Sequence, residues 1–176
     1  MRTRAAALAV LALLTGCTAP AAKLTGPSPD DVIKAATQIL TDSCLRRQHL
    51  VPPRPGQKVS ATDQQRVSDA LFGSGPAELS LRLPTGYVVR AHTDGCLASA
   101  NQRLYGDQRR WFQTSVIVNN LQPEASHDGV PLSVVRERHR AELADWDRLR
   151  THAVTTATSL LREEEQQQPT RGTTQP

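Results

Sequence analysis

Five histidines are the side chains of this sequence with the widest chemical use, because imidazole serves as a base, a proton carrier or a metal ligand near neutral pH. They are scattered along the chain, at His49, His92, His127, His139 and His152. None belongs to a His-Glu-x-x-His pattern or to a closely spaced set of histidines and cysteines, the arrangements that hold zinc. No glycine-rich phosphate loop and no nucleophile elbow is present either. The sequence therefore predicts no catalytic constellation, no metal site and no cofactor.

His139 has the clearest local setting of the five, since it falls on the apolar stripe of a helix expected from Val130 onward. It is either a histidine packed in the core or at its boundary, which the sequence favours, or a residue that acts as a ligand or a base. We therefore treat His139 as a candidate binding residue.

The segment from Tyr105 to Trp111 gathers a second group of polar and aromatic side chains. It could form a recognition corner. The interpretation that the sequence favours is a turn between two helices, in which Gly106 ends the first helix, Asp107 caps the second and Trp111 packs in the core. The candidate binding residues of this segment are Tyr105, Asp107, Arg109 and Arg110.

The first seventeen residues carry a targeting signal. A basic head of four residues precedes the unbroken apolar run Ala5–Leu14, which is typical of a secretory signal peptide. The next residues, Leu14-Thr15-Gly16-Cys17, resemble a bacterial lipobox. That resemblance implies cleavage after Gly16, a diacylglyceryl thioether on Cys17 and attachment to the outer face of the cell membrane. The alternative is an ordinary signal peptide followed by a chance cysteine.

The chain after Cys17 divides into a tether, one domain and a tail. Residues 17–30 are small, polar and proline-containing, and we expect a flexible tether that reaches at most ~45 Å from the bilayer. Residues 31–162 are expected to form a single globular domain. Residues 163–176 are rich in glutamate, glutamine and threonine, and they predict a disordered tail.

Two cysteines, Cys44 and Cys96, remain once Cys17 is assigned to the lipid. Cysteines outside the cytoplasm usually pair, so we expect a Cys44–Cys96 disulfide. A metal pair or a reactive thiol are the alternatives. Neither cysteine has the nearby cysteine or histidine that a metal pair requires.

Hydrophobic periodicity predicts an α+β fold that is predominantly helical, with about five helices and one β-hairpin. The hairpin spans residues 78–92, with Leu79, Leu81, Leu83, Tyr87, Val89 and Ala91 on one apolar face. Residues 123–129 read as a loop after a helix that ends near Leu121. One long helix is expected from Val130 to about Leu160. The disulfide would join the first helix to the start of the third.

A broader resemblance covers roughly residues 30 to 122. The pattern Gly95-Cys96, then Leu104-Tyr105-Gly106-Asp107, then Trp111, is similar to one in uncharacterised secreted lipoproteins of actinobacteria. This resemblance implies an extracytoplasmic location and the disulfide. It implies no activity and no catalytic residue.

Composition and charge further limit the classes of ligand and partner that we expect. Aromatic residues make up 3% of the chain, too few for an aromatic-lined ligand groove. Loss of Arg2 and Arg4 with the signal peptide lowers the formal net charge from +4 to +2, which gives no reason to expect nucleic-acid binding. The arginines at 136, 138 and 140 could face anionic lipid or wall polymers, although the interleaved Glu137 favours a solvated helix face.

The sequence predicts a lipid-anchored, non-catalytic binding protein whose partner is an envelope protein, a wall component or a small ligand. An envelope enzyme or enzyme accessory is one alternative. A peptide-capturing accessory or immunity-type lipoprotein is another.

Overall fold

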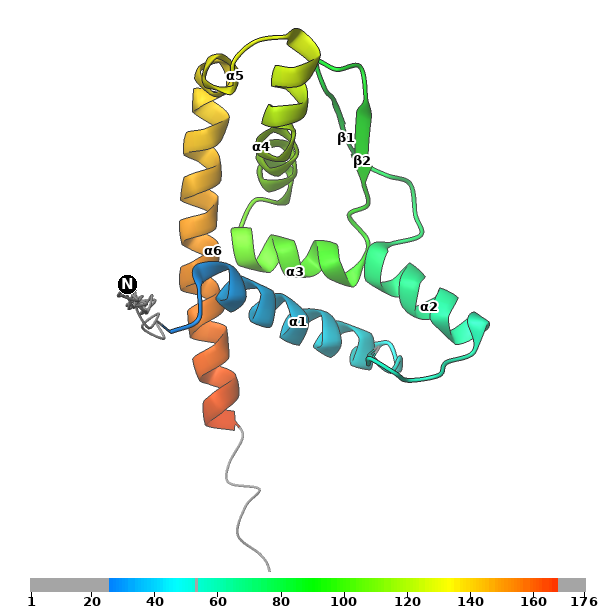
Figure 1. Cartoon of the computed structure of the whole chain (residues 1–176). Coiled ribbons are helices and arrows are strands. Elements are labelled where there is room, and N and C mark those ends of the chain that lie inside the picture. The colour runs from blue at the N-terminus through cyan, green and yellow to red at the C-terminus, as the bar shows by residue number, and fades with distance from the viewer. Residues whose placement is uncertain (1–25, 53, 168–176) are drawn as a thin grey trace, which may run out of the picture.

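In the computed structural model, which describes residues 26–52 and 54–167, six helices pack together and a two-stranded antiparallel hairpin lies at one side, next to the fourth helix (Figure 1). The helices are α1 (Pro29–Arg47), α2 (Ala61–Phe72), α3 (Cys96–Tyr105), α4 (Gln108–Asp128), α5 (Leu132–Arg138) and α6 (Arg140–Gln167). The strands are β1 (Leu79–Arg82) and β2 (Val88–Ala91). The predicted α+β, mostly helical fold is confirmed, with six helices in the described residues where about five were expected. Cys17 and the segments 1–25 and 168–176 lie outside the described residues.

The start of helix α1 is stabilised by a capping box and by a proline in the first turn. The Ser28 side chain accepts a hydrogen bond from the Asp31 N–H, the Asp31 carboxylate accepts one from the Ser28 N–H, and Pro29 occupies the first turn. Helix α1 thus begins at Pro29, within the last residues expected to be tether.

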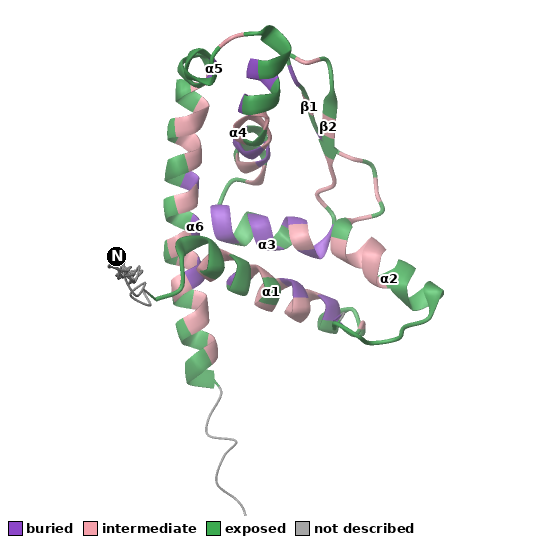
Figure 2. Ribbon diagram, in the orientation of Figure 1, coloured by how far each residue is buried: buried purple, intermediate pink, exposed green. Residues whose placement is uncertain are grey.

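The main core lies where α1, α3 and α6 meet. Its buried side chains are Ala36, Leu104, Tyr105, Leu149, Ala153 and Ala157. Small alanines allow the long helix α6 to approach α1 and α3 closely, and Figure 1 shows these two shorter helices beside its middle. Burial is concentrated on α3, whereas α2 has no buried residue (Figure 2).

A disulfide between Cys44 and Cys96 joins α1 to the first residue of α3, with the two Cα atoms 5.7 Å apart. The predicted pairing is confirmed. The Gln48 side-chain amide lies 3.4 Å from the Cys96 sulfur. Because α2 and the hairpin lie between the two cysteines in sequence, the bond closes a loop around both.

The start of α3 is held by a carboxylate that occupies a turn between α2 and β1. Asp94 accepts hydrogen bonds from the backbone N–H groups of Gly75, at 2.8 Å, and Ser74, at 3.2 Å. These bonds lower the pKa of Asp94 below its ordinary value of 3.8. Gly95 has no room for a side chain, since a Cβ there would lie 2.6 Å from backbone atoms of Leu71 and Gly73.

The hairpin forms with the expected apolar face except at one position. Leu79 pairs with Ala91 and Leu81 with Val89, while Leu79 and Leu83 are buried. Tyr87, expected on this face, is instead 75% exposed. It lies at the turn, one residue before β2 begins, and its carbonyl accepts a hydrogen bond from the Leu83 N–H at 2.8 Å, so the backbone pairing continues there while the side chain stays exposed.

The prediction of a loop at residues 123–129 is wrong, because α4 continues through Pro123 to Asp128. Proline adopts a helical φ but removes one hydrogen-bond donor and crowds the preceding turn, a cost that the burial of Leu121 and Ala125 on this helix offsets. The helix ends instead at Gly129, whose φ of 66° is left-handed.

The single helix expected from Val130 is also wrong, since it is divided at His139 into α5 and α6. Figure 1 shows α5 end-on above α6, so the chain turns sharply there. The turn allows Val135, which is fully buried, to pack against Leu121 and Ala125 of α4 while α6 runs toward the main core.

The predicted disordered tail is wrong in its first part, because α6 is helical to Gln167. Its last turns carry Leu160 and Leu161, which are only partly exposed and extend the apolar stripe of the helix. None of the helices in the described ranges is both long enough and apolar enough to cross a membrane.

Candidate functional site

The segment from Tyr105 to Asp107 is a tight turn between α3 and α4, as one of the two sequence interpretations expects. Gly106 ends α3 with a φ of 78°, and the Asp107 carboxylate accepts a hydrogen bond from the Arg110 N–H at 2.9 Å. This cap fixes the first turn of α4, and with it the positions of Arg109 and Arg110.

A cavity of about 570 Å³ lies between this first part of α4, the start of α6 and strand β1. We call it the α4–α6 cavity. Its lining residues are Leu81, Asp107, Arg109, Arg110, Gln113, Thr114, Ile117, Ala141, Glu142 and Asp145. It therefore brings three of the predicted binding residues together with two carboxylates of α6 that the sequence did not single out.

The two arginines of the cavity have different surroundings. Arg110 donates through Nε to the Asp145 carboxylate at 2.5 Å, and Arg148 on the next turn of α6 pairs with the same carboxylate. Arg109 is exposed and has no ion pair or side-chain hydrogen bond within the described part of the chain. Arg109 is thus the guanidinium at the cavity whose donors are free to meet a ligand.

The carboxylates at the cavity are mostly engaged in the fold. Asp107 caps α4, and Asp145 holds two arginines. Glu142 is the exception, since its only ion pair among the described residues is a loose one with His139 at 3.8 Å. A general acid or base must be able to reach a substrate proton, so Glu142 is the carboxylate of this cavity that could do so.

Tyr105 does not reach the cavity. It is buried in the main core, where its ring centre lies 5.2 Å from that of Trp111 and 6.3 Å from that of Trp146. Burial raises the pKa of the Tyr105 hydroxyl. Its position is that of a packing residue.

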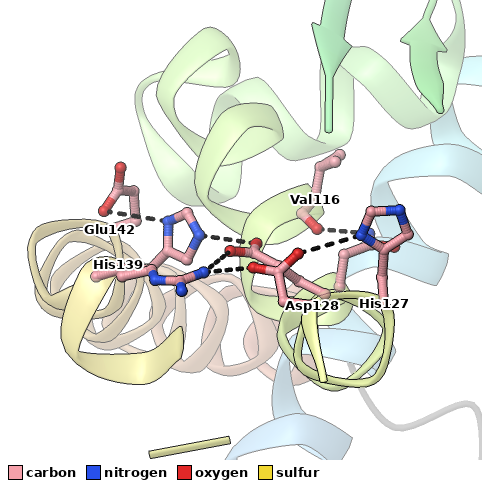
Figure 3. Close-up of polar contacts among 8 residues, drawn as sticks. Val116, His127, Asp128, His139 and Glu142 are labelled. Carbon is pink, nitrogen blue, oxygen red and sulfur yellow. Dashed lines mark hydrogen bonds and ion pairs between the residues drawn. The ribbon is translucent and has the colours of Figure 1, made fainter. Parts of the chain in front are cut away.

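His139 lies at the break between α5 and α6, where it joins a polar cluster that the sequence did not reveal (Figure 3). Its Nε2 is 2.9 Å from Glu124 Oε2, and its Nδ1 faces Glu142. Glu124 is only 5% exposed, and its other oxygen lies 3.6 Å from Arg138. This cluster fixes the turn, because a buried carboxylate is stable only when it is paired and hydrogen-bonded.

Arg138 extends the cluster to the end of α4. It donates to the Asp128 carboxylate at 2.5 Å, and the other oxygen of Asp128 lies 3.1 Å from His127 Nδ1. Both hydrogen bonds lower the pKa of Asp128, with that from Arg138 the stronger cause. Glu124 shares one helical face with Leu121 and Ala125, and this spacing could have identified it. Because the sequence predicts a loop at residues 123–129, the helical spacing was not applied there.

Within residues 26–52 and 54–167, no three histidine, cysteine or carboxylate side chains are grouped so that they could hold a metal ion. The geometry of the α4–α6 cavity favours recognition of a ligand through Arg109 and its neighbours. Comparison of the chain with protein-family models, with curated proteins and with solved structures finds no match.

Proposed function

We propose that this protein is a lipoprotein anchored by lipid to the outer face of the cell membrane, and that it binds its ligand, without chemical turnover, in the α4–α6 cavity. The observation that carries the binding proposal is the free guanidinium of Arg109 at a cavity of about 570 Å³. Small-molecule sites are typically clefts of about 300–1,000 Å³ with a few placed polar groups. The anchor proposal rests on the signal peptide and the lipobox-like residues that end at Cys17.

The lining of the cavity favours a ligand with an anionic group and a short apolar part. Arg109 offers the planar donor pattern that suits a carboxylate or phosphate. Leu81, Ile117 and Ala141 offer apolar surface to the remainder of the ligand. A small wall component or the end of a peptide has this chemistry.

The binding site is tested by crosslinking on intact cells, followed by mass spectrometry of the material attached to the protein. Wild type and Arg109→Ala are compared, with Arg103→Ala as the matched control. Arg103 is an exposed arginine on α3 that does not line the cavity. A partner that is lost in Arg109→Ala and kept in the control supports the proposal. Equal recovery in all three proteins contradicts it.

The anchor is tested separately. Cys17→Ala removes the proposed lipid attachment, so the protein should leave the membrane fraction and appear in the soluble fraction. Two acyl chains hold a protein on a bilayer firmly, at ~0.8 kcal/mol per buried CH₂. If Cys17→Ala still requires detergent for extraction, the lipid anchor is wrong.

An envelope enzyme is a second candidate, and the observation that favours it is the line of groups from Glu142 through His139 to Glu124. Glu142 lines the cavity, and His139 could orient it as an acid or base. Turnover of a wall-derived substrate by wild type, lost in Glu142→Gln and kept in Glu163→Gln, would establish this candidate. Glu163 is the control because it is an exposed glutamate near the far end of the same helix.

A further inference from the structure

The outer edge of strand β2 carries backbone groups that point away from the fold. The Leu83 N–H donates to the Tyr87 carbonyl at 2.8 Å, and the register pairs Arg82 with Val88 and Ser80 with Arg90. Directly opposed residues in an antiparallel pair alternate between bonded and non-bonded positions. Counting from the Leu83–Tyr87 pair places Val88 and Arg90 at non-bonded positions. Their N–H and C=O groups therefore face outward from β2.

Nothing in the described part of the chain covers this edge. Strand β1 lies between β2 and α4, and Figure 1 shows β2 on the outer side of the hairpin. Val88, the first residue of β2, is 39% exposed, and Tyr87 just before it is 75% exposed. An open strand edge of this kind is a template for a further strand.

The charges on the exposed face of the hairpin indicate what kind of strand would pair there. Arg90 and Arg82 both lie on this face, and neither has a carboxylate partner among residues 26–52 and 54–167. A second copy of β2 would bring its own Arg90 close to this one, and like charges across strands are destabilising. An acidic strand would instead place carboxylates beside Arg90, while Arg82 lies one strand farther away on the same face and adds to its positive charge.

We propose that the outer edge of β2 binds an extended peptide of alternating acidic and apolar residues, which adds a third strand to the hairpin. Its acidic side chains lie on the face of Arg82 and Arg90. Its apolar side chains lie on the other face, beside Val89 and Ala91, which are half-buried against the fold. Backbone hydrogen bonds to Val88 and Arg90 provide the affinity, and the side-chain alternation provides the specificity. This site is separate from the α4–α6 cavity, so the failure of either proposal leaves the other standing.

The test uses the full chain in detergent and two fluorescein-labelled six-residue peptides, one of alternating glutamate and valine and one of alternating lysine and valine. Fluorescence polarisation measures binding of each peptide to wild type and to three variants. Arg90→Glu reverses the charge beside the edge. Val88→Pro removes an outward N–H and leaves the bonds to β1 in place, because residue 88 is at a non-bonded position. Arg103→Glu is the matched control on α3.

Wild type and Arg103→Glu should bind the acidic peptide. Arg90→Glu and Val88→Pro should bind it at least tenfold more weakly, and Arg90→Glu should gain affinity for the basic peptide. Hydrogen exchange followed by mass spectrometry should show new protection confined to residues 87–91. The absence of acidic-peptide binding, equal binding of both peptides, or protection elsewhere would overturn the proposal. So would a dimer of the full chain that Arg90→Glu strengthens and the acidic peptide fails to dissociate.

Discussion

Removal of the Cys44–Cys96 disulfide should lower the free energy of unfolding by an amount that the loop length sets. The two cysteines are 52 residues apart, and chain-entropy theory gives about 4 kcal/mol for a loop of that size. For a domain of this size each kcal/mol shifts Tm by about 2–4 °C, so the midpoint should fall by about 8–16 °C. The loss arises mainly because the unfolded chain regains the freedom that the crosslink removes.

The assay is urea and thermal unfolding followed by circular dichroism, with three samples: oxidised wild type, reduced wild type, and Cys44→Ala/Cys96→Ala. The second and third samples should lose similar stability. The reductant should leave the double variant unchanged, which controls for other effects of the reagent. A loss below about 1 kcal/mol, or alkylation of both thiols in the folded protein without reductant, would refute the reasoning.

Three further predictions concern single residues. Gly95→Ala should lower the free energy of unfolding by about 1–3 kcal/mol in urea melts, because its Cβ would meet backbone atoms 2.6 Å away; Gly26→Ala, which has open space around it, should have no effect. Glu124→Ala should cost about 1–3 kcal/mol by leaving the His139 ring without its acceptor, whereas Glu124→Gln should cost less. The Asp94 carboxylate has a lower pKa in the folded protein than its ordinary value of 3.8, so its contribution is complete well above pH 4 and is lost as the pH falls through the lowered value. Asp94→Asn should therefore flatten the decline of stability in melts between pH 5 and pH 2, and unchanged pH dependence would contradict this assignment.

The sequence was sufficient to predict the elements whose ends depend on residues close to them in the chain. Gly106 and Asp107 define the turn between α3 and α4 through the left-handed φ of one and the hydrogen bond of the other. The hairpin followed from strict alternation, and the disulfide from the pairing expected of two cysteines outside the cytoplasm.

The errors arose where distant packing outweighs local preference. Pro123 normally argues against a helix interior, yet it is tolerated because the residues that follow it are buried against α5. The break at His139 depends on the pairing with Glu124, fifteen positions earlier in the chain, which no local pattern reveals.

The sequence predicted only part of the candidate site, again because distant packing brings the remaining residues together. Arg109 and Arg110 were identified by their type and their place beside a turn. Glu142 and Asp145 became their neighbours only through the packing of α6 against α4. Tyr105, identified by the same local reasoning, belongs to the core because the two tryptophans that cover it come from different helices.

The closed loop around α2 and the hairpin also determines what happens when the backbone is cut. A protease that cleaves between Cys44 and Cys96, for example in the segment between α1 and α2, produces two pieces that the disulfide still joins. The nicked protein therefore keeps α3 to α6 attached to the N-terminal part of the chain. Such a cut adds only one water molecule to the mass of the protein, and the two fragments come apart as separate chains only after a reductant has cleaved the disulfide.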